Sequence, residues 1–177
     1  MLPVMAAPPQ RNMLRLGTVA EVDHAAARCR VASGSIVTDW LPWIAAHAAD
    51  TASWSPPAPG EQGLLLCPDG DLTGAAFLRG LYSDANSPPS TDGHIHMLRF
   101  PDGTVLHYDH SAHALRVELT AGGSLRVIAA GGVTIDGDVQ INGTLRASGD
   151  CVASGISLAG HTHGGVQAGS SQTGGPA

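Results

Sequence analysis

Residues 131–164 read GGVTIDGDVQINGTLRASGDCVASGISLAGHTHG, and this stretch decides the fold of the chain. A glycine recurs every six residues from Gly131 to Gly155. The odd-numbered positions between the glycines carry small or branched apolar side chains, beginning with Val133 and Ile135. The even-numbered positions from Thr134 onward are polar for most of the stretch. Because side chains alternate between the two faces of a strand, the pattern predicts short β-strands with one buried face and one solvent face.

The buried positions become smaller along the stretch. They change from valine and isoleucine, through leucine and alanine, to cysteine, alanine and serine. A core that shrinks in this way describes a rod that narrows toward its C-terminal end. His161 and His163 stand on the same parity at the narrow end.

Strands this short bury too little surface in one chain to offset an ordering cost of about 1–2 kcal/mol per residue. A single-chain β-helix uses about three hexapeptides per coil, so the repeats present here would complete fewer than two coils. A prism of three chains needs only one short strand per chain in each layer. The number of repeats therefore favours a three-chain prism, that is, a homotrimer.

The N-terminal half has a different composition, because most aromatic side chains of the chain lie there. We expect them to form its core, and they are Trp40, Trp43, Trp54, Phe77 and Tyr82. Alternating segments between turn residues predict strands over 15–22, 28–33, 36–44, 62–67 and 73–82, with a helix over 43–50 as an alternative. Several short strands in so few residues favour a small closed barrel, with the OB fold as the first candidate.

The predicted fold is therefore all-β, and the chain divides into five parts. Further strands are expected over 95–100, 104–109, 114–120 and 124–129. The parts are a flexible arm (1–12), an OB-fold domain (13–85), a linker rich in proline and serine (86–93), an intertwined trimeric β-helix shaft (94–160), and an apex with its tail (161–177).

Charge and cysteine content limit the possible functions. All nine positive side chains are arginine and the formal net charge is -6, so no electrostatic footprint for nucleic acid is visible. The three cysteines form no CxxC pair, and we expect Cys29, Cys67 and Cys151 to be small buried hydrophobes. No segment reaches the roughly 20 apolar residues of a membrane span, and no signal-peptide pattern is present. We expect the chain to be made and folded in a cytoplasm.

Several short motifs occur along the chain in a fixed order. In the N-terminal half they are RLGTV (15–19), WLPW (40–43), WSPP (54–57), GEQG (60–63), CPDGD (67–71) and GLYS (80–83). In the C-terminal half they are FPDGT (100–104), YD (108–109), the glycine-spaced strands and HTHG (161–164). Together, in this order, they resemble the central spike, or baseplate assembly protein V, of contractile-tailed bacteriophages and tailocins.

The resemblance implies a homotrimer with an OB-fold domain at its base, a triple-stranded β-helix as its shaft and a sharp apex. In similar spikes the apex holds one iron ion through the His-x-His motif of each of three chains, so the resemblance makes His161 and His163 metal ligands. It implies the tail tube and baseplate hub as partners, the bacterial outer membrane as target, and a position at the baseplate tip of the virion. Because no lysozyme or peptidase segment is present, puncture would be mechanical. Assembly would take place in the host cytoplasm, and delivery would be to the host outer membrane and periplasm.

The chemistry of the two histidines agrees with such a site. At positions i and i+2 of a strand they would point the same way, about 7 Å apart. Six imidazoles on a threefold axis suit a transition metal such as iron better than zinc, which prefers four ligands. Each ring also needs an acceptor for its second N–H, with Thr162, Ser157 and residues 170–171 as candidates. The alternative is a polar tail that happens to contain two histidines.

The remaining motifs favour no enzyme. We expect His94 and His96 to be wall residues, and His107, His110 and His113 to form a surface cluster. No nucleophile elbow or phosphate-binding loop is present, so no small-molecule substrate is expected. Two other classes stay open, namely an OB-fold nucleic-acid-binding module and a trimeric hexapeptide-repeat acyltransferase. The first is disfavoured because residues 13–83 hold four arginines against seven acidic side chains.

Overall fold

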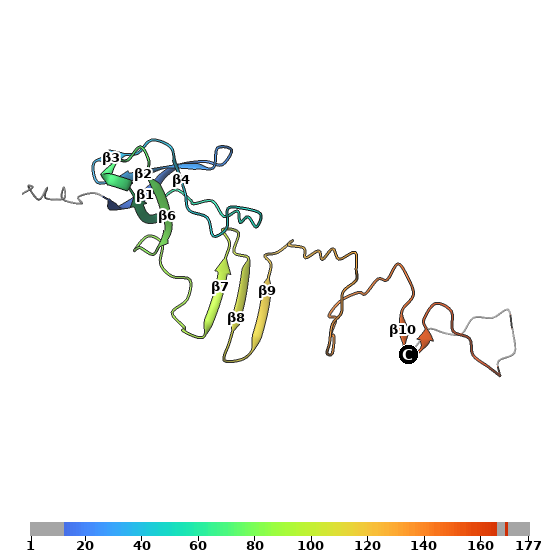
Figure 1. Ribbon diagram of the computed structural model, residues 1–177. Coiled ribbons are helices and arrows are strands. Elements are labelled where there is room, and N and C mark those ends of the chain that lie inside the picture. Colours follow the sequence, from blue (N-terminus) through green and yellow to red (C-terminus); the bar gives the residue numbers. More distant parts are fainter. Residues whose placement is uncertain (1–12, 166–168, 170–177) are drawn as a thin grey trace, which may run out of the picture. The chain divides into compact units, whose positions relative to one another are not determined.

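The computed structural model describes residues 13–165 and residue 169, and its secondary structure is almost entirely β (Figure 1). The arm predicted over residues 1–12 lies outside the described residues. The described residues fall into two units, which are divided between Leu125 and Arg126. No helix in the described part of the chain is long and apolar enough to cross a membrane. The predicted all-β fold class is confirmed.

The N-terminal unit begins with six strands and one short 3₁₀ turn. They are β1 (Leu14–Asp23), β2 (Arg28–Ser33), β3 (Ile36–Val37), β4 (Leu41–Pro42), β5 (Gln62–Leu66), η1 (Pro68–Gly70) and β6 (Ala76–Leu81). The sheet has the order β3-β2-β1-β5-β6, and β4 also pairs with β2. All of these strand pairs are antiparallel.

The sheet closes into a barrel through the segment that follows β4. Cys29 of β2 lies opposite Leu41 of β4, and two residues later Trp43 forms a parallel bridge with Phe77 of β6. The N–H of Ile44 then donates to the carbonyl of Phe77 at 2.9 Å. The circuit β1-β5-β6-β4-β2 is thereby complete, as predicted for a closed barrel.

The predicted strand over 36–44 is interrupted, and the alternative helix over 43–50 does not form. The break lies at Thr38, which is almost fully buried and whose hydroxyl accepts the N–H of Val31 at 3.0 Å. Because a side chain takes the place of a backbone acceptor here, the ladder stops and restarts as β4. This interruption turns the chain toward β6 and allows the barrel to close.

The barrel core is smaller than the aromatic content predicts. Its buried members are Val19, Cys29, Val31, Leu41, Leu65, Cys67, Ala75 and Phe77. Trp43 packs against this core from outside it, whereas Trp40, Trp54 and Tyr82 are exposed. The prediction of an aromatic core therefore holds for Phe77 and in part for the half-buried Trp43. It is wrong for Trp40, Trp54 and Tyr82, because a narrow barrel has room for one large ring. The backbone also approaches closely: a Cβ at Gly63 would lie 2.2 Å from the carbonyl oxygen of Leu78.

Two of the three cysteines behave as predicted. Cys29 and Cys67 are buried in the barrel core, and burial raises the pKa of each thiol. Cys151, in contrast, is exposed in the single chain. It lies in the C-terminal unit, which has no comparable core.

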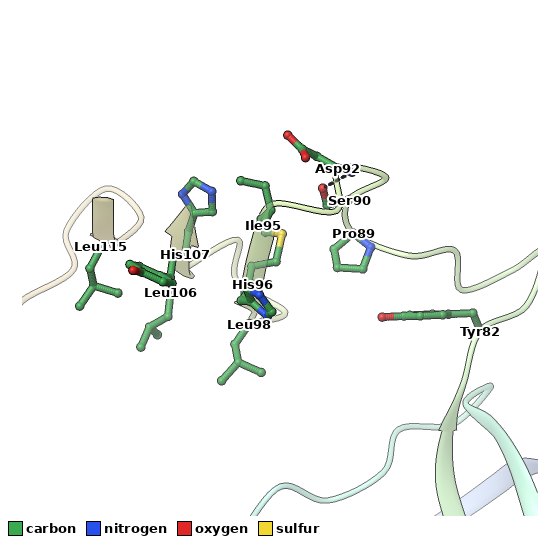
Figure 2. Close-up of a pocket in the computed structure, with 12 residues that line it drawn as sticks. Tyr82, Pro89, Ser90, Asp92, Ile95, His96, Leu98, Leu106, His107 and Leu115 are labelled. Atoms are coloured by element: carbon green, nitrogen blue, oxygen red, sulfur yellow. Dashed lines mark hydrogen bonds between the residues drawn. The ribbon is translucent and has the colours of Figure 1, made fainter. Parts of the chain in front are cut away.

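A three-stranded antiparallel sheet follows, with the strands predicted for the start of the shaft. It consists of β7 (Ile95–Arg99), β8 (Val105–Asp109) and β9 (Ala114–Glu118). Figure 2 shows Leu98, Leu106 and Leu115 on one side of the sheet, with Ile95 and His107 on the other. The three leucines are exposed, at 63%, 39% and 70%. The sheet therefore has an apolar face that the single chain leaves uncovered.

Residues 119–151 contain no strand in the single chain, although the sequence predicts strands over 124–129 and through the glycine repeat. The apolar side chains of the repeat are exposed: Val133, Ile135, Val139, Ile141 and Leu145 all lie between 50% and 67%. Isolated strands have no partners for their backbone N–H and C=O groups, which explains why one chain alone forms no ladder here.

The described chain regains strand structure near its C-terminal end. The strands β10 (Val152–Ala153) and β11 (Ile156–Ser157) form an antiparallel hairpin. Its two-residue turn has positive φ at Ser154 and Gly155, as hairpin loops of this length require. The chain therefore reverses at Gly155, in the part of the repeat where most even-numbered positions are apolar.

Candidate metal centre

The C-terminal hairpin is closed by one carboxylate. Asp150 Oδ1 accepts the N–H of Cys151 at 2.8 Å and the N–H of Ala159 at 2.9 Å. The N–H of Leu158 donates to the carbonyl of Cys151 at 2.8 Å. The two ends of the hairpin are thus tied together immediately before the histidine motif.

Hydrogen bonds keep this carboxylate ionised. The side chain of Ser157 is the largest cause that lowers the pKa of Asp150, followed by the backbone N–H of Ala159. Both donors favour the charged form, because a carboxylate accepts hydrogen bonds better than a carboxylic acid. At neutral pH Asp150 therefore acts as a permanent acceptor for the hairpin.

The hairpin in turn positions the first histidine of the motif. The carbonyl oxygen of Ser157 accepts the backbone N–H of His161 at 3.1 Å and lies 2.9 Å from its ring Nδ1. The Ser157 hydroxyl accepts the N–H of Gly160 at 2.8 Å. With the proton on Nδ1, donated to Ser157, the Nε2 lone pair of His161 is free for a metal. Among the predicted acceptors, Ser157 is thus the partner of His161, through its main chain; residues 170–171 lie outside the described residues.

The two histidines of the motif lie side by side. The ring centroids of His161 and His163 are 5.2 Å apart with an interplanar angle of 79°, and both residues are exposed. The segment is not a strand, so their proximity does not come from the strand spacing that the sequence predicts. Exposed, oriented imidazoles are suitable ligands for a first-row transition metal.

One chain does not complete a metal site by itself. Among residues 13–165 and 169, no three histidine, cysteine, aspartate or glutamate side chains converge on one point. The donor set of the tip therefore fits an ion only if further chains contribute ligands. His161 and His163 would be the contribution of this chain.

The structure groups the remaining histidines differently from the prediction. His110 lies beside His94 and His96, with ring centroids 5.0 Å and 5.6 Å away. His107 projects from the opposite face of the sheet (Figure 2). The predicted cluster of His107, His110 and His113 is therefore corrected, because β7–β8 pairing brings residues distant in sequence together.

A pocket of about 560 Å³ lies beside the three-stranded sheet (Figure 2). Its lining includes Leu98, Leu106 and Leu115, together with Tyr82 and Pro89 from the preceding segment. The lining also includes the polar side chains of Ser90, Asp92, His96, His107 and Tyr108. The expectation that the chain has no small-molecule substrate stays a prediction.

Comparisons with known proteins agree with this arrangement. Residues 15–82 match the Type VI secretion system/phage-baseplate injector OB domain, which coincides with the barrel. Residues 155–177 match the GpV Apex motif, which begins at the hairpin turn. The chain is 41% identical over 121 residues to the spike protein of Escherichia phage P2, an alignment covering 65% of this chain and 57% of that protein. The chain thus spans little more than half the length of this curated relative. The chain thus carries a phage-baseplate injector OB domain and a GpV apex motif, and it is similar to a phage spike protein.

Proposed function

We propose that three copies of this chain form a spike that punctures the bacterial outer membrane mechanically. The observation that carries the proposal is the exposure of large apolar side chains throughout the C-terminal half, which is followed by the two adjacent imidazoles of His161 and His163. A single chain has no means of covering these side chains, whereas identical chains around a threefold axis cover one another.

The free energy available from such packing is large. Leu115 is 70% exposed, Val133 66% and Leu145 67% in the single chain. Burying each side chain contributes about 1.5–3 kcal/mol, in triplicate for every layer of a trimer. Assembly and folding of the shaft would therefore be one event.

The tip needs a different source of stability, because its side chains are too small to hold three chain ends together. His161 and His163 from three chains would supply six nitrogen ligands, a set that suits one iron ion on the threefold axis. When bound, this ion would cross-link the three chain ends. The Ser157 carbonyl would keep the ring of His161 turned so that Nε2 faces the axis.

The other end of the spike would join the phage tail. We assign the barrel of residues 13–85 to contacts with the tail tube and the baseplate hub, because the matched domain is described as a baseplate injector domain. The spike would be assembled in the host cytoplasm and carried at the baseplate tip of the virion. The role is mechanical, so no catalytic residue is assigned.

The nucleic-acid alternative receives little support from the barrel. Two of its four arginines form ion pairs, Arg30 with Glu21 at 2.8 Å and Arg79 with Glu61 at 2.9 Å. Paired arginines offer less charge to a phosphate backbone than free ones. The acyltransferase alternative requires a β-helix whose coils form within one chain. The repeat region forms no such coil in the single chain.

Light-scattering mass and elemental analysis of one purified sample test the proposal together. We expect a mass of three chains and about one iron per three chains, without added metal. A monomeric mass for the soluble, folded chain would overturn the trimer. A trimer without any transition metal would overturn the proposed metal site at the tip, and the proposal of a trimeric shaft would stand.

A further inference from the structure

Three histidines lie together at one end of the β7–β8 pair, far along the chain from the apex motif. The N–H of His110 donates to the carbonyl of His94 at 3.1 Å, which extends the strand ladder by one pair. His94 Nδ1 and His110 Nε2 are 3.1 Å apart. His96, two residues further along β7, has its ring centroid 5.6 Å from that of His110. All three residues are exposed in the single chain.

The backbone beneath these rings is held on both sides. The N–H of His94 donates to Asp92 Oδ1 at 2.9 Å, which fixes the entry to β7. Asp109 Oδ1 accepts the N–H groups of Ser111 and Ala112 at 2.9 and 3.1 Å, which fixes the turn that follows His110. The two facing imidazoles therefore start from anchored Cα positions, and little ordering entropy remains to be lost on binding a ligand.

The separation of the two nitrogens suits a shared ion. Two nitrogen ligands about 2.0–2.1 Å from a metal lie about 2.9–3.4 Å apart, for angles between octahedral and tetrahedral values. The observed 3.1 Å falls inside this window. The same distance also allows the two rings to share one proton, so a metal would replace that proton after a modest rotation of the rings.

We propose that His94 and His110, with His96 as an adjacent third ligand, form a metal site separate from the apex. Imidazole ligands select a borderline divalent transition ion such as Zn²⁺, Ni²⁺ or Cu²⁺. Among the described residues, no three histidine, cysteine, aspartate or glutamate side chains surround one point. Before the rings rotate, the site therefore offers two ligands, His94 and His110, and water would complete the coordination of the ion. Bound there, the ion cross-links the end of the linker to β8.

The test uses the full-length chain carrying His161→Ala and His163→Ala, so that the apex contributes no binding. Calorimetric titration with Zn²⁺ and with Ni²⁺ should show one saturable site per chain. Further replacement of His94 or His110 by alanine should weaken binding at least tenfold, and His96→Ala should weaken it less. The exposed His24, which lies in the turn after β1, is the matched control, and His24→Ala should leave the affinity unchanged.

A second measurement protects the test against misfolding. The melting temperature of the parent should rise on addition of Zn²⁺, and that of the His94→Gln variant should not, while both give the same circular dichroism spectrum without metal. Absence of saturable binding below millimolar ion, or equal loss of affinity in His24→Ala, would overturn the site. Neither result would bear on trimer mass or apex iron, so failure here is separate from failure of the proposed spike.

Discussion

The carboxylate of Asp150 accepts the backbone N–H of Ala159 at 2.9 Å, across the whole C-terminal hairpin. This hydrogen bond joins the start of the hairpin to Ala159, two residues before His161. The next contact along the chain is the Ser157 carbonyl, which lies against the His161 ring. Asp150 therefore acts on the histidine motif through the hairpin, as a positioning residue.

Replacing Asp150 tests this chain of contacts. Asp150→Ala removes the acceptor for Cys151 and Ala159, so the amide of Ala159 should exchange its hydrogen at least several-fold faster. Asp150→Asn keeps a side-chain oxygen at the same place and should fall between the wild type and the alanine variant. Hydrogen exchange followed by mass spectrometry measures both. Equal exchange at Ala159 in all three proteins would contradict the role assigned to the carboxylate.

Acid should loosen the same hairpin. The pKa of Asp150 is lower in the folded chain than its ordinary value, so its stabilising effect is complete above the unfolded pKa and disappears as pH falls through the folded value. We therefore expect the Ala159 amide to keep its protection from about pH 7 down to about pH 5 and to lose it from about pH 4 downward. The Asp150→Asn variant has no such carboxyl, and its protection should not change in this window. A wild-type profile as flat as that of the variant would show that the charge is irrelevant.

The barrel core can be tested with two aromatic residues of contrasting burial. Phe77 is fully buried, whereas Tyr82 is 63% exposed, although the sequence predicted both in the core. Phe77→Ala should lower the free energy of unfolding by about 3–5 kcal/mol. Tyr82→Ala should change it by less than about 1 kcal/mol, as expected for a surface position. Urea unfolding of the barrel measures both changes. Equal losses of unfolding free energy in the two variants would support the predicted aromatic core.

The barrel strands were predictable because local signals and tertiary structure agree. Alternating residues and turn residues mark β1, β2, β5 and β6, and the structure has these strands within a few residues of the predicted limits. The size of the barrel interior depends on how the whole sheet closes, and no local sequence pattern indicates it. That is why Trp43 and Trp54 were assigned to the core, whereas in the structure their rings lie next to each other at its margin, with centroids 5.6 Å apart and planes tilted by 57°.

The candidate site was visible in the sequence only in part. The His-x-His motif identifies His161 and His163, and Ser157 was among the candidate acceptors for their rings. Asp150 was missed, because it acts on the motif only through the hairpin that reverses the chain. The available signal was the Ser154–Gly155 pair between two apolar residues, which is typical of a two-residue hairpin turn. The six-residue period concealed this signal, because Gly155 also fits the repeat. Similarly, the contact of His94 with His110 follows from the pairing register of β7 with β8, which places Ile95 opposite Asp109. The distance between the two histidines along the sequence does not reveal this contact.

The repeat region provides a test of which face meets the other chains. Ile141→Asp would place a carboxylate from each chain on the axis of the proposed trimer, where neither water nor an opposite charge stabilises it, and should abolish assembly. Gln140→Asp makes a similar change on the opposite parity and should leave the trimer intact. Light scattering distinguishes the two outcomes. A trimeric Ile141→Asp variant with an unchanged melting temperature would show that the odd-numbered face is not the buried one.

The tip provides the most direct test of the proposed spike. The double replacement His161→Ala and His163→Ala removes every imidazole of the apex motif and should reduce iron from about one per trimer to none. In the proposed trimer the apolar side chains of the shaft would hold the chains together, so the variant should remain trimeric. Thr162→Ala, between the two histidines, leaves both ligands in place and should retain the iron. Phage particles carrying the double variant should adsorb normally and deliver DNA less often per adsorbed particle, because frayed chain ends make a blunter tip. An iron content near three per trimer in the wild type would mean that each chain binds its own ion, and the shared site on the axis would have to be abandoned.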